Sequence, residues 1–214
     1  KRRTRAMIAK EKGVQPLADA IFAQDRNGKA PEELAKDFLN PDLGVETIED
    51  ALSGASDIIA ERISDDAELR KSLRARMQKS ALCESKAAKE DEDSVYRLYY
   101  DFHQLVSKLQ SHQVLALNRG EKEGYLKVAL DLDRMEAMQL IQRRVVKPGS
   151  PAMAFLAAAA EDSYDRLIFP SLEREIRNLL TDAANEAAIR NFALNLKPLL
   201  MQPPVKGFVT MGLD

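Results

Sequence analysis

The sequence of 214 residues is poor in the residues that build disulfide-linked, membrane-spanning or zinc-binding proteins. Its single cysteine, Cys83, excludes an internal disulfide, and we therefore expect a cytoplasmic protein. No apolar run approaches the roughly 18 residues of a membrane span, and no signal peptide is visible, so we expect no membrane association. His103 and His112 have no second cysteine nearby to complete the about four ligands that zinc requires.

The charge balance and the low aromatic content argue against a general nucleic-acid-binding domain. Lys and Arg number 32 against 34 Asp and Glu, which gives a net charge of −2. Charged residues of mixed sign make up 31% of the chain, as is typical of solvated amphipathic helices. Aromatic residues make up only 6%, whereas single-strand binders stack bases on aromatic side chains. Tyr96, Tyr99 and Phe102 fall at core spacing, so we assign them to the core.

Helix signals are frequent in the first half of the chain. Pro16 and Pro31 suit the first turns of two helices. Thr47 with Asp50 resembles a capping box that opens a helix, although Gly54 inside that helix costs about 1 kcal/mol relative to alanine. Ser64 is expected to cap the next helix. Apolar residues at helical spacing then predict a helix over 95–109.

The second half combines a short β element with long helices. Residues 111–120 fit a short helix that ends at Gly120, or a strand. Alternation over 126–132 predicts a strand, whose partner is either 114–118 or a segment outside the chain. Pro170 is expected to break and restart the following helix, in which Ile176 lies on a buried stripe, and Pro198 to kink or end it.

The overall prediction is a mainly α multi-helix fold with a β element near 125–132 and a truncated terminal strand at 205–213. We divide the chain into a helical region at 1–110, a helix, strand and helix connector at 111–149, a long-helix region at 150–202 and the first strand of a further domain at 203–214. A lone strand cannot pair its backbone groups, and the first residue is not Met. We therefore expect the chain to be a fragment of a larger protein.

Several stretches match one family in order along the whole chain. The most specific are DRLIFPS at 165–171 with EREIR at 173–177, and QPPVKG at 202–207 with GLD at 212–214. Others are KRRTRA at 1–6, ALSGA at 51–55, YRLYYDF at 96–102 and NRGEKEG at 118–124. Together they resemble the Tex-type transcription accessory proteins of bacteria. The sequence departs at QSHQ, residues 110–113, where that family reads Pro-Ser-His-Arg, so a role for that arginine is not carried over.

The resemblance implies a larger protein with an N-terminal helix-turn-helix region, a YqgF-type RNase H-like domain, helix-hairpin-helix elements and a C-terminal OB-fold RNA-binding domain. It maps this chain to the internal helical region plus the first strand of the YqgF-like domain, without the OB fold. It implies RNA or DNA as the partner of the full-length protein, with the transcription machinery as a further partner. Asp214 would be the first-strand acid of the RNase H-like domain.

We expect no enzymatic activity, no cofactor and no metal site in this chain. Metal-assisted phosphodiester cleavage needs several convergent carboxylates, and Asp214 stands alone here. Asp131, Asp133 and Glu136 lack the spacing of a calcium loop, and Asp133 is interpreted as a helix cap.

Three basic clusters are the candidate nucleic-acid contacts, although each also fits a solvated helix face. The candidate residues are Lys1, Arg2, Arg3 and Arg5, then Arg70 and Arg74, then Arg143 and Arg144. The sequence favours a helical scaffold that supports nucleic-acid binding by the full-length protein. The alternatives are a protein-interaction core without nucleic-acid contact and, less favoured, part of a metal-dependent nuclease-like enzyme. Binding by the chain itself is expected to be weak and salt-sensitive, with a dissociation constant of roughly 10–100 μM or poorer.

Overall fold

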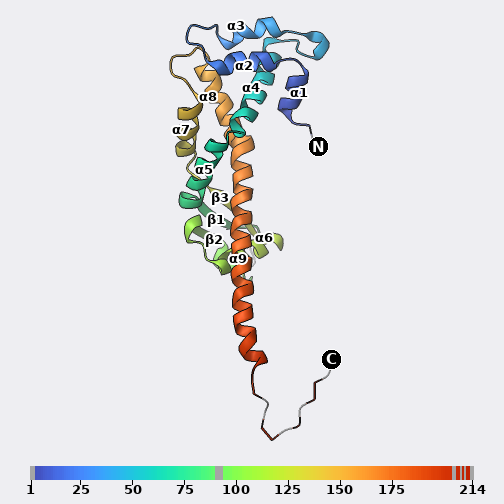
Figure 1. The fold of residues 1–214 in the computed structure, drawn as a ribbon, viewed down its shortest axis with the longest axis vertical. Helices are drawn as coiled ribbons and strands as arrows, with labels where there is room; N and C mark the ends of the chain where they lie inside the picture. The colour runs from blue at the N-terminus through green and yellow to red at the C-terminus, as the bar shows by residue number, and fades with distance from the viewer. Residues whose placement is uncertain (1–2, 90–93, 204–205, 208, 210, 213–214) are drawn as a thin grey trace. The chain divides into compact units, whose positions relative to one another are not determined.

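The computed structural model describes residues 3–89, 94–203, 206–207, 209 and 211–212, and more than half of the chain lies in α-helices (Figure 1). A three-stranded sheet accompanies the helices, so the predicted mainly α class is confirmed. The chain forms two compact units. The first comprises Lys1–Leu82, Leu105–Ser107 and Leu130–Ile176, and the second comprises Cys83–Gln104, Lys108–Ala129 and Arg177–Asp214.

The first unit is built around helix α4, Ile48–Ser64. Helix α4 contacts several helices of this unit, because its small and branched side chains Ala51, Ala55 and Ile59 are fully buried among them. The partner helices are α1 (Arg5–Glu11), α2 (Gln15–Ala23), α3 (Pro31–Ala35) and α8 (Met153–Asp162). Helices α5 (Ala67–Ser80) and α7 (Arg134–Val145) pack on each other.

Gly54 has a packing role that its helix propensity does not reveal. A Cβ atom at this position would lie 2.8 Å from Cγ2 of Val14 and 3.3 Å from Cβ of Ala9. The absence of a side chain therefore allows α4 to approach the end of α1 closely, which offsets the conformational cost of a glycine inside a helix.

Capping signals locate two helix starts, one of them differently from the sequence prediction. The capping box of α4 is confirmed, because the Asp50 amide donates to Thr47 Oγ1 at 3.1 Å and the Thr47 amide donates to Asp50 Oδ2 at 3.0 Å. The predicted cap at Ser64 is wrong, because Ser64 is the last residue of α4. Asp66 caps α5 instead, since its backbone is extended and its Oδ1 accepts from the Leu69 amide at 3.0 Å.

Pro170 does not break the helix as the sequence suggested. Helix α8 continues through a π-helical segment, Ser163–Ile168, into the long helix α9, Phe169–Leu200. Proline lacks the amide hydrogen and crowds the carbonyl four residues earlier, here that of Arg166. Arg166 lies in the π-helical segment, whose turns are wider than those of an α-helix. The chain therefore remains helical around Pro170. Ile176 on α9 is 1% exposed, which confirms its predicted burial.

The second unit contains most of the sheet, which is formed by β1 (Leu82–Ala87), β2 (Asp101–Leu105) and β3 (Leu126–Asp131) in the order β2-β1-β3. The Ala87 amide donates to Tyr100 and the Ala88 amide to Tyr125, so the end of β1 lies beside the starts of β2 and β3. Both pairings are therefore antiparallel. The strand at 126–132 is confirmed, but its partner is β1, so both expected partners, residues 114–118 and a segment outside the chain, are wrong.

The helix predicted over 95–109 is wrong, and this segment includes strand β2. Val95 and Leu98, two members of the expected apolar stripe, are exposed, whereas Tyr96 is buried. A 3₁₀ turn at Arg97–Tyr99 leads into β2, which pairs with β1. Strand β1 was not predicted, since its sequence LCESKA has few β-branched residues, and pairing on both sides explains why it is a strand.

Of the two interpretations of 111–120, the helical one is correct. Helix α6 covers Ser111–Lys122 and continues past Gly120, which is buried rather than terminal. A Cβ atom at Gly120 would lie 2.5 Å from Cδ1 of Leu126, so the glycine makes room for the first residue of β3.

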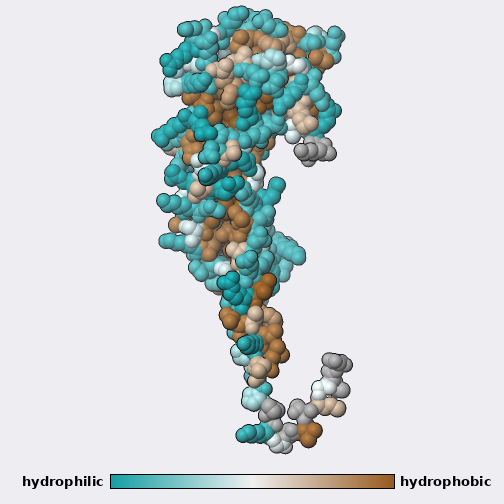
Figure 2. Space-filling view, viewed as in Figure 1, coloured by the Kyte–Doolittle hydropathy of each residue, from teal (hydrophilic) through white to brown (hydrophobic). Residues whose placement is uncertain are grey.

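Helix α9 continues past Pro198 to Leu200, and its last turns are apolar and exposed (Figure 2). The exposed side chains include Ile189, Phe192, Leu196, Leu199 and Leu200, which follow helical spacing. Much of the expected strand at 205–213 lies outside the described residues, as does Asp214. Of its described residues, Lys206 and Gly207 form a turn, and 209, 211 and 212 are in neither helix nor strand.

Candidate nucleic-acid interface

The N-terminal basic cluster is only partly available for a ligand. Lys1 and Arg2 lie outside the described residues. Arg3 forms an ion pair with Glu11 at the far end of α1. Arg5 opens α1 and is exposed. Of the four predicted residues here, Arg5 is the one for which the described part of the chain offers no ion pair.

The second and third clusters, distant in sequence, meet on the antiparallel helices α5 and α7. Arg144, in the last turn of α7, donates to Asp66 at the start of α5, at 2.5 Å and 3.0 Å. Arg76, near the end of α5, pairs with Glu136 in the first turn of α7 at 2.5 Å. These two ion pairs link opposite ends of the helix pair. The sequence alone places the clusters far apart, because their proximity depends on packing.

The two predicted arginines of α5, Arg70 and Arg74, turn toward the start of α9. Arg70 donates to Ser171 Oγ at 2.7 Å and to the Ser64 carbonyl at 3.2 Å. Arg74 forms a two-bond ion pair with Glu175, at 2.6 Å and 3.2 Å. Both guanidinium groups thus hold helices together within the first unit and are poorly placed to meet a phosphate.

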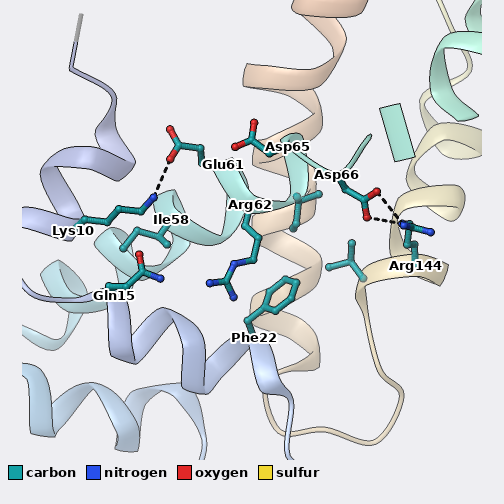
Figure 3. A pocket seen from close by; sticks show the side chains of 11 residues that line it. Lys10, Gln15, Phe22, Ile58, Glu61, Arg62, Asp65, Asp66 and Arg144 are labelled. Carbon is teal, nitrogen blue, oxygen red and sulfur yellow. Dashed lines mark hydrogen bonds and ion pairs between the residues drawn. The ribbon is translucent and has the colours of Figure 1, made fainter. Parts of the chain in front are cut away.

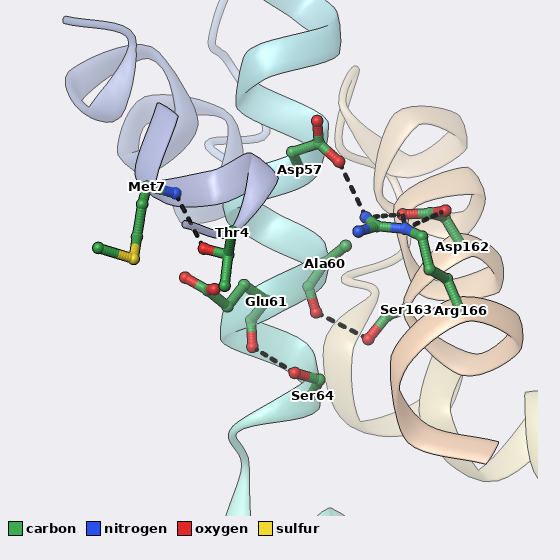
Figure 4. Close-up of polar contacts among 9 residues, drawn as sticks. All are labelled: Thr4, Met7, Asp57, Ala60, Glu61, Ser64, Asp162, Ser163 and Arg166. Carbon is green, nitrogen blue, oxygen red and sulfur yellow. Dashed lines mark hydrogen bonds and ion pairs between the residues drawn. The ribbon is translucent and has the colours of Figure 1, made fainter. Parts of the chain in front are cut away.

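The segment 165–177, which most resembles the family, uses its polar side chains for the same purpose. Arg166 reaches Asp57 of α4 at 2.9 Å and Asp162 one turn earlier (Figure 4). Asp165 accepts from Arg134 of α7 at 2.9 Å, and Glu173 accepts from the Leu130 amide of β3 at 2.8 Å. In the second unit, Arg177 reaches Glu121 of α6. The segment is therefore a row of structural links.

The electrostatics of these links differ with burial. Hydrogen bonds from Arg144 lower the pKa of Asp66, and they outweigh the opposing effect of desolvation. Burial raises the pKa of Asp57 in spite of the neighbouring Arg166 guanidinium. Beside this ion pair, the Ser163 hydroxyl donates to the Ala60 carbonyl at 2.8 Å (Figure 4). Burial also raises the pKa of Tyr164 to about 12, so this phenol is neutral at physiological pH.

A groove that the sequence did not predict lies between α1, α2, α4 and α7 (Figure 3). It encloses about 510 Å³, and its lining carries charges of both signs. Lys10 donates to Glu61 at 3.4 Å, and the Arg62 guanidinium lies 4.8 Å from the centre of the Phe22 ring. Because its cations already face carboxylates or an aromatic ring, this groove has no clear preference for an anion.

Two of the three acidic residues considered as metal ligands, Asp133 and Glu136, have structural partners. Asp133 caps α7, as predicted, because its Oδ1 accepts from the Met135 amide at 2.9 Å. Glu136 pairs with Arg76, and Cys83 is buried. Within the described ranges no group of three or more His, Cys, Asp or Glu residues could hold a metal ion. No helix in the same ranges is long and apolar enough to span a bilayer.

Comparison with known proteins supports the family resemblance. Residues 26–192 match the family model described as Tex central region-like. The chain is 40% identical to protein YdcI of Bacillus subtilis (strain 168) and 36% identical to the transcriptional accessory protein Tex of Neisseria gonorrhoeae, with all of this chain covered. It is 30% identical to human S1 RNA-binding domain-containing protein 1, with 99% covered. The chain spans only 30%, 29% and 22% of the lengths of these relatives.

Proposed function

Because this chain belongs to the Tex family, we propose that it is a helical scaffold within a nucleic-acid-associated transcription accessory protein and catalyses no reaction itself. The observation that carries the proposal is the use of segment 165–177. Asp165, Arg166 and Glu175 each bond to a partner outside this segment, on α7, α4 and α5. Side chains that bond to neighbouring helices hold the fold together, which is the role of a scaffold.

The nucleic-acid association is proposed for the full-length protein. One relative is named as a transcriptional accessory protein and another for an S1 RNA-binding domain. Since this chain spans 30% or less of these relatives, we assign the main RNA or DNA contact to the remainder of the protein. A bacterial transcription role would also place the protein in the cytoplasm, with the transcription machinery as a partner.

The scaffold proposal is tested by removing one link in the full-length protein. Arg166→Ala leaves Asp57 without its guanidinium partner, so we expect a lower melting temperature, whereas Arg26→Ala, an exposed charge in a loop, serves as the control. Below the melting temperature, RNA affinity and its salt dependence should match the wild type. Weaker RNA binding without a loss of stability would instead identify Arg166 as a ligand contact.

A protein-interaction core is the second candidate, favoured by the exposed apolar stripe at the end of α9. Stripes of this kind promote association. Replacing Phe192 and Leu199 with serine should reduce concentration-dependent self-association of this chain in sedimentation velocity. Leu194→Ser is the matched control, because Leu194 is equally exposed but lies off the stripe. Equal effects from both variants would contradict a directed interaction face.

A further inference from the structure

The antiparallel pair α5 and α7 concentrates positive charge in a chain whose net charge is −2. The two helices carry eight basic residues against two acids, Glu68 and Glu136. The basic residues are Arg70, Lys71, Arg74, Arg76, Lys79, Arg134, Arg143 and Arg144. Carboxylates of other elements pair with Arg74, Arg134 and Arg144, so the positive excess that a polyanion can meet comes from the remaining basic residues.

A groove of about 460 Å³ runs between these helices. Arg76 and Ser72 line it from α5, and Gln139, Arg143 and Arg144 line it from α7. Arg143 is exposed, and the structure gives it no ion pair or hydrogen bond with any described residue. A guanidinium and an amide in one groove are donors that phosphate oxygens accept from, whereas the Ser72 hydroxyl already donates to the Glu68 carbonyl at 2.9 Å.

The carboxylates at the groove do not block an incoming phosphate. The Arg76–Glu136 pair is 43% and 37% exposed, and exposed ion pairs of this kind contribute little to stability. A phosphate can therefore share or replace the carboxylate at small cost, because the planar guanidinium fork fits either anion. None of the described residues that line the groove is aromatic, so they offer no surface on which a base would stack.

We propose that the α5–α7 groove binds the phosphodiester backbone of a nucleic acid, with Arg143 as the primary contact and Arg76 as the second. Because the groove contacts phosphates only, its binding depends on the charge and spacing of the phosphates and not on the base sequence. The inference rests on the proposed function, since it gives the scaffold one direct contact with the nucleic acid that the rest of the protein binds.

The first test measures binding of a labelled oligonucleotide by this chain over a series of salt concentrations. Arg143→Ala should weaken binding roughly tenfold at low salt and reduce the salt slope by about 1. Arg190→Ala removes the same charge from an exposed position on α9 and is the control. Poly-U, poly-dT and duplex probes distinguish RNA from DNA and single from double strands.

The second test predicts a gain of binding. Glu136→Gln removes the carboxylate that faces Arg76, so affinity should rise roughly twofold to fivefold. Glu186→Gln, an exposed acid on α9, is the control. A merely structural role for the Arg76–Glu136 pair would lower stability without tightening binding, which overturns the second contact.

Failure of the inference differs from failure of the scaffold proposal. No binding even at low salt, or equal losses for Arg143→Ala and Arg190→Ala, would overturn the groove and leave the scaffold proposal intact. If Arg5→Ala were the only variant to weaken oligonucleotide binding, the contact would lie in the N-terminal cluster and not in the groove. The scaffold proposal fails only on the Arg166→Ala experiment in the full-length protein.

Discussion

Arg144 ties the last turn of α7 to the N-cap residue of α5 by donating two hydrogen bonds to Asp66, at 2.5 Å and 3.0 Å. The same carboxylate caps α5, because its Oδ1 accepts from the Leu69 amide at 3.0 Å. Asp66 thus caps α5 and also holds the last turn of α7 in place. The arginine belongs to one predicted basic cluster and the carboxylate adjoins another, so neither cluster is simply a solvated face.

Asp66→Ala should destabilise the chain by about 1–3 kcal/mol, because it removes both the helix cap and the ion pair with Arg144. Urea denaturation measures the change. Asp65→Ala is the matched control, since Asp65 is exposed and no described hydrogen bond involves its carboxylate, and it should stay within about 0.5 kcal/mol. Equal losses would show that the effect is general charge removal.

Acidification should reduce stability partly through Asp66. Its pKa is lowered from 3.8 in the folded state, so its contribution is present above pH 3.8 and is lost as pH falls through the lower folded pKa. Asp66→Asn should therefore flatten the loss of stability below pH 3.8, measured by urea denaturation at several pH values. A variant as acid-sensitive as the wild type would contradict this assignment.

Asp57 should show the opposite sign. Burial raises its pKa, so the charged form costs stability above the folded pKa, and protonation removes that cost as pH falls. Asp57→Asn should make the acid-induced loss of stability steeper than in the wild type. A flatter profile would mean that Arg166, rather than burial, dominates the environment of this carboxylate.

Ile176→Ala should cost about 2–5 kcal/mol, because the side chain is 1% exposed and its removal leaves a cavity. Leu179, three residues further along α9, is 46% exposed and is the control. Leu179→Ala should cost about 0.5 kcal/mol or less. Thermal or urea unfolding compares the two, and similar losses would contradict the packing of this helix.

Gly120→Ala should destabilise the second unit by about 1–3 kcal/mol, although alanine is the better helix former. The new Cβ would lie 2.5 Å from Leu126 Cδ1 and 3.0 Å from the Tyr96 ring, where no side chain fits without movement. A gain of stability in urea denaturation would show that Leu126 repacks freely.

The predictions that succeeded depend on residues close together in the chain. The capping box of Thr47 with Asp50, the cap at Asp133 and the burial of Ile176 each depend on neighbours within one or two turns. Helix geometry brings such residues together whatever the rest of the protein does. The order of residues along the chain was therefore sufficient to predict the mainly α class and to reveal the family resemblance.

Long-range packing decided the rest. Strand β1 has little intrinsic strand preference and exists because β2 and β3 pair with its two edges. The arginines of α5 have the same local sequence signal, yet Arg70 and Arg74 turn to α9 while Arg76 lines the groove with Arg143. The carboxylate that pairs with Arg74 lies about one hundred residues away in sequence. Which arginines pair with a carboxylate and which remain open to a ligand depends on distances between residues far apart in sequence. Only the tertiary structure determines these distances.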